Sequence, residues 1–179
     1  TGIWEFIYEA IEARGFEVVL AHPLQVKAIA SARVKTDKVD ARTLARLLYL
    51  DMVPASHVPP REVRDLRELL RNRKALVEQS TAFKNRVHAE LLRRGIKRPE
   101  TISSPFSSTA VAWMRSLNIR TVSWNLDIVE ALQAQVKEVN RVLLTRFDDM
   151  EDAKLIATVP GIGFYGAMLI AAEIDDVSR

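Results

Sequence analysis

Apolar residues recur at steps of three and four along most of the chain, which is the spacing of one face of an α-helix. Residues 3–14 follow this spacing, and Gly15 directly after them is a typical helix stop. The same spacing predicts a short helix over residues 24–31. A third helix is expected to begin after Thr36, which has the residue type of an N-cap, and to run to about Leu50.

Residues 16–21 depart from the helical pattern. They read Phe-Glu-Val-Val-Leu-Ala and are followed by His22-Pro23, which is typical of a short buried strand. A second short strand is expected near Met52, and Pro59-Pro60 has the composition of a linker. Residues 1–60 therefore predict a helix–strand–helix piece of an α/β layer.

Two long helices are predicted in the middle of the chain. Residues 61–95 contain no proline or glycine before Gly95, so one helix would extend over roughly 50 Å. After a breaker-rich loop at 97–109, a second helix over residues 122–147 carries an apolar seam at heptad-like spacing, formed by Val122, Leu126, Val129, Leu132, Val136, Val139 and Leu143. Two such helices predict an antiparallel hairpin. A bundle packed on its own core is the alternative to a protruding coiled coil. The coiled coil is favoured, because neither helix is apolar enough to be enclosed.

Composition narrows the classes of protein. The chain has 179 residues, of which 48% are hydrophobic and 27% charged, as in ordinary globular proteins. It has no cysteine, which excludes disulfides, thiolate zinc sites and cysteine nucleophiles, and its three histidines lack a metal-ligand spacing. No apolar run reaches the roughly 18 residues of a membrane span, and no signal peptide is visible, so a cytoplasmic protein is expected.

Because the helical pattern is already under way at the first residues, we expect an internal piece of a longer protein.

Positive charge is concentrated in one segment. The net charge is +3, but residues 61–98 hold twelve basic and five acidic residues, net +7. The predicted helix presents ten cations, mostly arginines: Arg61, Arg64, Arg67, Arg71, Arg73, Lys74, Lys84, Arg86, Arg93 and Arg94. Arginine favours bidentate phosphate contact, so this segment predicts polyanion binding. A solvated helix face is the alternative.

Asp37 and Asp40 are the candidate chemical pair. At i and i+3 of a helix the two carboxylates share a face, and such oxygens suit Mg²⁺ or Mn²⁺. Lys35, Lys38 and Arg42 surround them and would suit a phosphate-bearing substrate. Two carboxylates alone are too few for two-metal phosphoryl transfer, and acidic residues also favour any helix N-terminus. The pair therefore fits both a partial metal site and a plain helix start.

A glycine-rich turn near the end of the chain is the third candidate. Pro160, Gly161, Ile162 and Gly163 follow Val159 and precede an apolar helical run. This is the hairpin of helix-hairpin-helix motifs, in which glycines let the backbone approach a phosphate closely. A plain packing turn between two helices is the alternative.

The order of these features resembles the DEDD-class insertion-sequence transposases, which include the Piv-type DNA invertases. Thr1-Gly2-Ile3-Trp4 resembles the end of the family's E-A-T-G-x-[YW] stretch, and residues 15–19 with His22-Pro23 resemble its next strand and turn. Lys35-Thr36-Asp37-x-x-Asp40-Ala41 matches its K-x-D-x-x-D-A motif. Residues 159–163, followed by Ala172-Glu173-Ile174, resemble the opening of its C-terminal domain.

The resemblance implies a fold in three parts. Residues 1–60 would be the C-terminal part of a RuvC-like (RNase H-like) catalytic domain, 61–150 a coiled-coil region, and 151–179 the start of a helix-hairpin-helix-like transposase domain. The fragment would be mainly α. Asp37 and Asp40 would be the last two metal-binding carboxylates of the tetrad; its other two members and the C-terminal domain's serine are expected outside the chain.

The implied activity is Mg²⁺-dependent DNA cleavage and joining in a bacterial or archaeal cytoplasm, with DNA and a structured guide RNA as partners and the coiled coil pairing subunits. Lys35, Lys38 and Arg42, together with Arg64, Arg67, Arg71, Lys74, Arg86 and the turn 160–163, are the predicted nucleic-acid contacts. The fragment alone is expected to be inactive. A non-catalytic nucleic-acid-binding module and a purely dimerising coiled coil are the alternatives.

Overall fold

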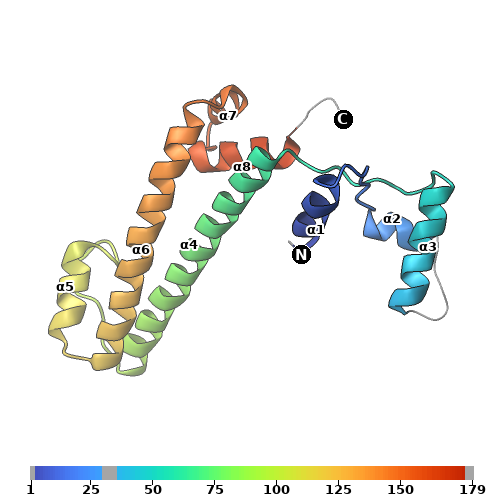
Figure 1. Ribbon diagram of the computed structural model, residues 1–179. Coiled ribbons are helices and arrows are strands. Elements are labelled where there is room, and N and C mark those ends of the chain that lie inside the picture. Colours follow the sequence, from blue (N-terminus) through green and yellow to red (C-terminus); the bar gives the residue numbers. More distant parts are fainter. Residues whose placement is uncertain (1–2, 30–35, 176–179) are drawn as a thin grey trace. The chain divides into compact units, whose positions relative to one another are not determined.

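The structure, a computed structural model, describes residues 3–29 and 36–175 and is mainly helical over them (Figure 1). Its helices are α1 (Ile3–Glu12), α2 (Pro23–Ile29), α3 (Asp37–Tyr49), α4 (Arg61–Arg93), α5 (Ser108–Ser116), α6 (Arg120–Phe147), α7 (Glu151–Ala157) and α8 (Phe164–Ile174). The chain divides between Pro59 and Pro60 into two compact units.

The helices of the first unit follow the predicted stops and caps. Gly15 has φ +79°, a left-handed conformation that glycine adopts without the Cβ penalty, three residues after the end of α1. The Thr36 hydroxyl accepts a hydrogen bond from the Val39 backbone N–H at 3.3 Å, which satisfies one of the donors at the start of α3. The predicted helix at 24–31 is confirmed as far as Ile29, and its last two positions lie outside the described residues.

The predicted strand over residues 16–21 is wrong. In the described part of this unit the only β pairing is an isolated antiparallel bridge between Ala21 and Ala55. His22 donates its backbone N–H to the Pro54 carbonyl at 2.8 Å, and Ser56 donates to Leu20 at 2.6 Å. The strand expected near Met52 is reduced to the same bridge. A β-branched run becomes a strand only where a partner pairs along its length, and among the described residues pairing occurs only at its end.

Apolar side chains of the first unit are largely exposed. Leu47 is the only side chain buried in α1, α2 or α3. On α1, Ile3, Phe6 and Ile7 face outward, with Phe6 78% exposed. These helices therefore have regular caps but little core.

The second unit is built on two long antiparallel helices, α4 and α6 (Figure 1). Arg73 on α4 pairs with Asn140 on α6, and Glu90, further along α4, pairs with Thr121 near the start of α6. The predicted long helix at 61–95 is confirmed almost to the residue, and Gly95 again has a positive φ just beyond its end. The second long helix begins at Arg120, slightly earlier than expected.

Two apolar clusters hold the second unit, one at each end of this hairpin. The tip cluster joins the ends of α4 and α6 near their connection to the loop and α5, and consists of Val87, Leu91, Ile102, Ala110, Met114, Val122 and Leu126. The base cluster joins the opposite ends to α7 and α8, and consists of Leu66, Leu70, Leu143, Ala153, Ala167, Met168 and Ala172. Between them the seam is thinner, since Leu132, Val136 and Val139 are only half-buried.

Helix α5 was not predicted from the sequence. The Ser107 hydroxyl accepts from the Ala110 N–H at 3.2 Å and caps its start. Ala110 and Met114 then turn into the tip cluster, and Arg115 bridges to Asp127 and Glu130 on α6 at 2.7 and 2.9 Å. A helix of nine residues supplies too few turns for its period to stand out from the neighbouring loop.

Arg67 joins the base of α4 to the end of α8. Its Nε donates to the Ala172 carbonyl at 2.7 Å and its guanidinium also donates to the Glu173 carbonyl at 3.2 Å. The side chain is only 15% exposed. A cation on the unsatisfied carbonyls of a helix C-terminus is favourable for both the dipole and the hydrogen bonds. Arg67 thus acts as a cap for a helix more than a hundred residues away in the sequence.

We predict that Arg67→Gln lowers the free energy of unfolding of this chain by about 2 kcal/mol, because hydrogen bonds to a charged donor are lost at a largely buried site. Arg61→Gln removes the same charge from the exposed first turn of α4 and is expected to change stability by less than about 0.5 kcal/mol. Urea unfolding followed by circular dichroism measures both. Equal stability of the two variants would contradict the capping role.

Candidate metal-binding carboxylates and nucleic-acid interface

Asp37 and Asp40 lie in the first turn of α3, one turn apart and both exposed. The predicted spacing on one helix face is therefore present. Lys38 and Arg42 are exposed on the same helix, while Lys35 lies outside the described residues. The Thr36 cap sets the first residue of α3. Both carboxylates therefore lie at the N-terminal end of the helix, where its dipole is positive.

The pair supplies two of the oxygen donors that a hard-cation site would need. Over the residues that the structure describes, no three acidic or histidine side chains gather closely enough to hold a metal ion. Two exposed carboxylate oxygen donors suit Mg²⁺ or Mn²⁺, which keep water ligands and share their site with substrate phosphates. The residues present thus fit part of such a site and need further ligands to complete it.

The cations at the base of α4 are mostly engaged by the protein itself. Besides the Arg67 cap, Arg71 donates to the Glu173 carboxylate at 3.1 Å, and Lys74 pairs with Glu78 at 3.8 Å. Arg73 donates to Asn140 at 2.6 Å, and its guanidinium lies 4.0 Å from the ring centroid of Tyr165.

Arg64, another of the predicted contacts, is half-buried. Arg67, Arg71 and Arg73 thus link α4 to α8 or α6, while the side chains of Arg71 and Lys74 remain 65% and 66% exposed.

The cations near the tip of the hairpin are more exposed. Arg86 lies 4.6 Å from the Phe83 ring and is exposed on the surface of α4. From Lys84 to Glu100 the chain holds six cations and two carboxylates, net +4, whereas from Arg61 to Glu78 six cations face four carboxylates, net +2.

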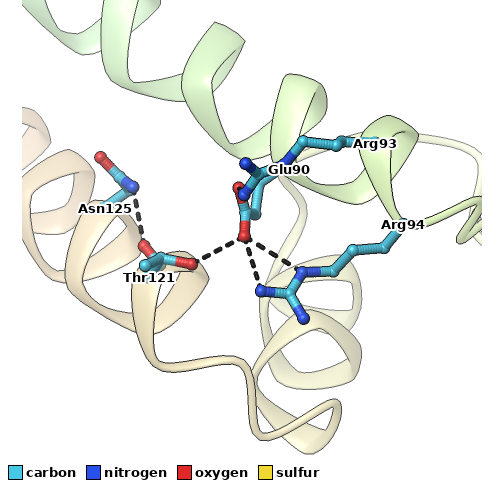
Figure 2. A network of polar contacts seen from close by, with 5 residues as sticks. All are labelled: Glu90, Arg93, Arg94, Thr121 and Asn125. Atoms are coloured by element: carbon cyan, nitrogen blue, oxygen red, sulfur yellow. Dashed lines mark hydrogen bonds and ion pairs between the residues drawn. The ribbon is translucent and has the colours of Figure 1, made fainter.

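Glu90 organises the tip, as Figure 2 shows. Its carboxylate accepts two hydrogen bonds from Arg94, at 3.0 and 2.8 Å, one from the Thr121 hydroxyl at 3.0 Å, and one from Arg93. Arg94, and after it Thr121, hold the pKa of the Glu90 carboxyl below its ordinary value. One carboxylate therefore orients two arginines of α4 and ties them to the first turn of α6.

The glycine-rich turn connects α7 to α8. Ile162 donates its backbone N–H to the Val159 carbonyl at 3.0 Å, and Gly161 has φ +91°. Pro160, Gly161 and Gly163 are exposed, while Ile162 packs against the base cluster. Gly163 has φ −82°, which any residue adopts, and beyond its chain neighbours no described atom lies within 4 Å of a Cβ added there. The backbone of Gly163 is therefore open to an approaching molecule.

The carboxylates and the turn were found from sequence spacing, whereas the tip was not. Lys97, Arg98 and Trp124 were not singled out, although residues 93–98 hold four cations. The sequence does not show which arginines of α4 bind other helices of this chain, because their partners on α6 and α8 are distant in sequence.

Comparison with known proteins assigns the chain to a class. A family model described as transposase, of the DEDD type of IS110, matches residues 1–97, more than half of the chain. The chain therefore belongs to the IS110-type DEDD transposases. The resemblance inferred from the motif order is confirmed at the level of the family.

Two curated relatives extend the match along the chain. It is 25% identical over 173 residues to a protein of Sinorhizobium fredii (strain NBRC 101917 / NGR234) named "Putative transposase y4qE", covering 97% of this chain and 43% of that protein. It is 29% identical over 177 residues to the transposase for insertion sequence element IS1328 of Yersinia enterocolitica, covering 96% and 52%. The chain thus spans about half the length of these relatives.

Across residues 3–29 and 36–175, none of the helices combines the length and the hydropathy that a membrane crossing needs.

We predict that Glu90→Gln lowers the melting temperature at pH 7 and that this loss shrinks in acid. A carboxyl whose pKa is depressed on folding contributes stability above its unfolded pKa, ordinarily 4.5, and loses that contribution as the pH falls through the folded value. Melting temperatures of the native chain and the variant, measured from pH 7 to pH 3, should therefore approach each other as the pH falls below 4.5. A difference that is constant with pH would contradict the network.

Proposed function

We propose that this chain is part of a DNA transposase that cleaves and joins DNA strands with Mg²⁺ or Mn²⁺, and that Asp37 and Asp40 are two of its metal ligands. The observation that carries the proposal is the carboxylate pair on the capped first turn of α3, within the stretch that matches the transposase family. In such a site the metal ions stabilise the attacking and leaving oxygens of phosphoryl transfer. The residues of this chain would bind and orient the ions, and Lys38 and Arg42 would attract the phosphate backbone.

The first unit is proposed to be the C-terminal part of an RNase H-like domain. Its exposed apolar side chains, including Ile3, Phe6 and Ile7, support this proposal. Helices with an uncovered apolar face need a sheet or another helix against them. The fragment alone is expected to be inactive, since two carboxylates cannot complete a two-metal site.

The second unit is proposed to bind nucleic acid and to pair subunits. Its α4 carries the excess positive charge of the chain, which supports a DNA partner and, in the same way, a structured guide RNA. The half-buried middle of the α4–α6 seam supports pairing with a second copy through a coiled coil. The turn at Pro160–Gly163 is proposed to place backbone N–H groups against DNA, as helix-hairpin-helix elements do.

The catalytic assignment is tested by Asp37→Asn and Asp40→Asn in a transposase extended to the length of its relatives. Each variant is expected to lower strand cleavage by roughly 100-fold or more while leaving DNA binding intact, because a metal ligand is lost and an uncharged isostere remains. Asp51→Asn is the matched control: Asp51 is an exposed carboxylate after the same helix, and its φ of +53° is one that asparagine tolerates. Full cleavage by Asp37→Asn would refute the metal role and favour a non-catalytic module.

The turn is tested by Gly163→Ala. The added methyl meets open space and an ordinary φ, so the free energy of unfolding should change by less than about 1 kcal/mol. If a phosphate approaches this backbone, the same methyl should weaken duplex DNA binding by about tenfold, or ~1.4 kcal/mol. Gly161→Ala, at φ +91°, is expected to cost stability instead. Unchanged DNA affinity in Gly163→Ala would leave the turn as a packing joint.

A further inference from the structure

The tip of the α4–α6 hairpin combines exposed cations with an exposed aromatic ring. Trp124, in the second turn of α6, is 60% exposed, which is unusual for the largest side chain in a protein. The Arg120 guanidinium lies 6.0 Å from its ring centroid, and Ile128, one turn further along, is also exposed. Val122, Leu126 and Val129 are buried on the other side of α6, the first two in the tip cluster, so Trp124 points away from the core.

Trp124 follows a member of the Glu90 network by about one turn of α6. Thr121, which donates to Glu90, and Trp124 are three residues apart on α6, and side chains at this spacing are neighbours on a helix surface. Arg93 and Arg94 reach the same carboxylate from α4 (Figure 2), and their side chains remain 73% and 46% exposed. Each guanidinium has five N–H groups, so both keep donors for another acceptor. Lys97 and Arg98 follow directly and are exposed.

The carboxylates near the ring are paired with arginines, and two of them share one guanidinium. Asp127 and Glu130, on the same part of α6, are both bound by Arg115. Glu90 is bound by two arginines. The tip of the hairpin therefore carries exposed cations at the end of α4 and just after it, and an exposed aromatic ring on α6. Phosphates satisfy the first and an unpaired base satisfies the second, whereas paired bases are stacked inside a duplex and are not available to a side chain.

We propose that the hairpin tip binds a single-stranded segment of nucleic acid, with an unpaired base stacked on Trp124 and its flanking phosphates held by Arg93, Arg94, Lys97 and Arg98. This deepens the nucleic-acid binding part of the proposed function and rests on it. The main nucleic-acid contact would then lie at the tip of the hairpin and not at the base of α4, where Arg67, Arg71 and Arg73 bind other helices.

The test is binding of the whole chain to a labelled single-stranded oligonucleotide over a salt series, with RNA, DNA and duplex of the same sequence as separate arms. The native chain is expected to prefer single strands, and stacking should quench its tryptophan emission. Trp124→Leu keeps an apolar side chain but no stacking face, and should weaken binding by about tenfold. Trp124→Phe keeps a ring and should bind within about twofold of the native chain, with the quenching lost.

The charge contribution is tested by the double variant Lys97→Gln, Arg98→Gln. The log–log salt slope should fall by about 1.4, or about 0.7 for each single-strand phosphate contact. Lys137→Gln with Arg141→Gln removes the same charge from exposed positions of α6 outside the tip and should leave the slope unchanged. All these positions are exposed, so melting temperatures should stay near that of the native chain.

Several outcomes would overturn the tip site. Native-like affinity of Trp124→Leu, or duplex bound as tightly as single strands without quenching, would do so. If tip variants bind single strands normally while Gly163→Ala weakens duplex binding, nucleic-acid binding stands and the tip site is wrong. A loss of dimer in Trp124→Leu with unchanged binding would assign the face to a second copy instead. Activity of Asp37→Asn bears only on the catalytic proposal.

Discussion

The second unit depends on α4 and α6 shielding each other. Neither helix is apolar enough to be surrounded by protein, and a long single helix in water gains little from its own hydrogen bonds. Pairing along one seam is enough to stabilise the two helices only because further elements pack on each end. These are α5 and the loop at the tip, and α7 and α8 at the base. The two ends are therefore distinct small cores joined by a thinner rod, and each can present its own surface.

This arrangement explains the uneven use of the arginines on α4. At the base, α8 ends against α4, so its carbonyls and the Glu173 carboxylate need cations, and Arg67 and Arg71 provide them. At the tip, Glu90 orients Arg93 and Arg94 while leaving them 73% and 46% exposed. Along one basic helix, Arg67 and Arg71 therefore bind the end of α8, whereas Arg93 and Arg94 share the carboxylate that bonds to α6.

Local signals in the sequence predicted most helices, because glycines, a threonine cap and uninterrupted apolar spacing act over a few residues. The Asp37–Asp40 pair was found for the same reason. The features that were missed depend on distant partners. The run at 16–21 is β-branched but pairs only at its end, the role of Arg67 depends on Ala172 and Glu173, and α5 has too few turns for a visible period. The exposure of Trp124 likewise depends on how its helix packs, because Val122 and Leu126 are buried on the opposite face.

The length of α4 has a mechanical consequence. Its 33 residues extend over roughly 50 Å, with the base cluster at one end and the Glu90 network at the other. The hairpin can act as a lever, because its base packs on α7 and α8 and its tip is far from them. For a helix of this length, a rotation of about 10° at the base would move the tip by roughly 9 Å. This is more than the distance between two successive base pairs. Modest repacking around Met168 would thus be amplified into a large displacement of whatever the far end holds.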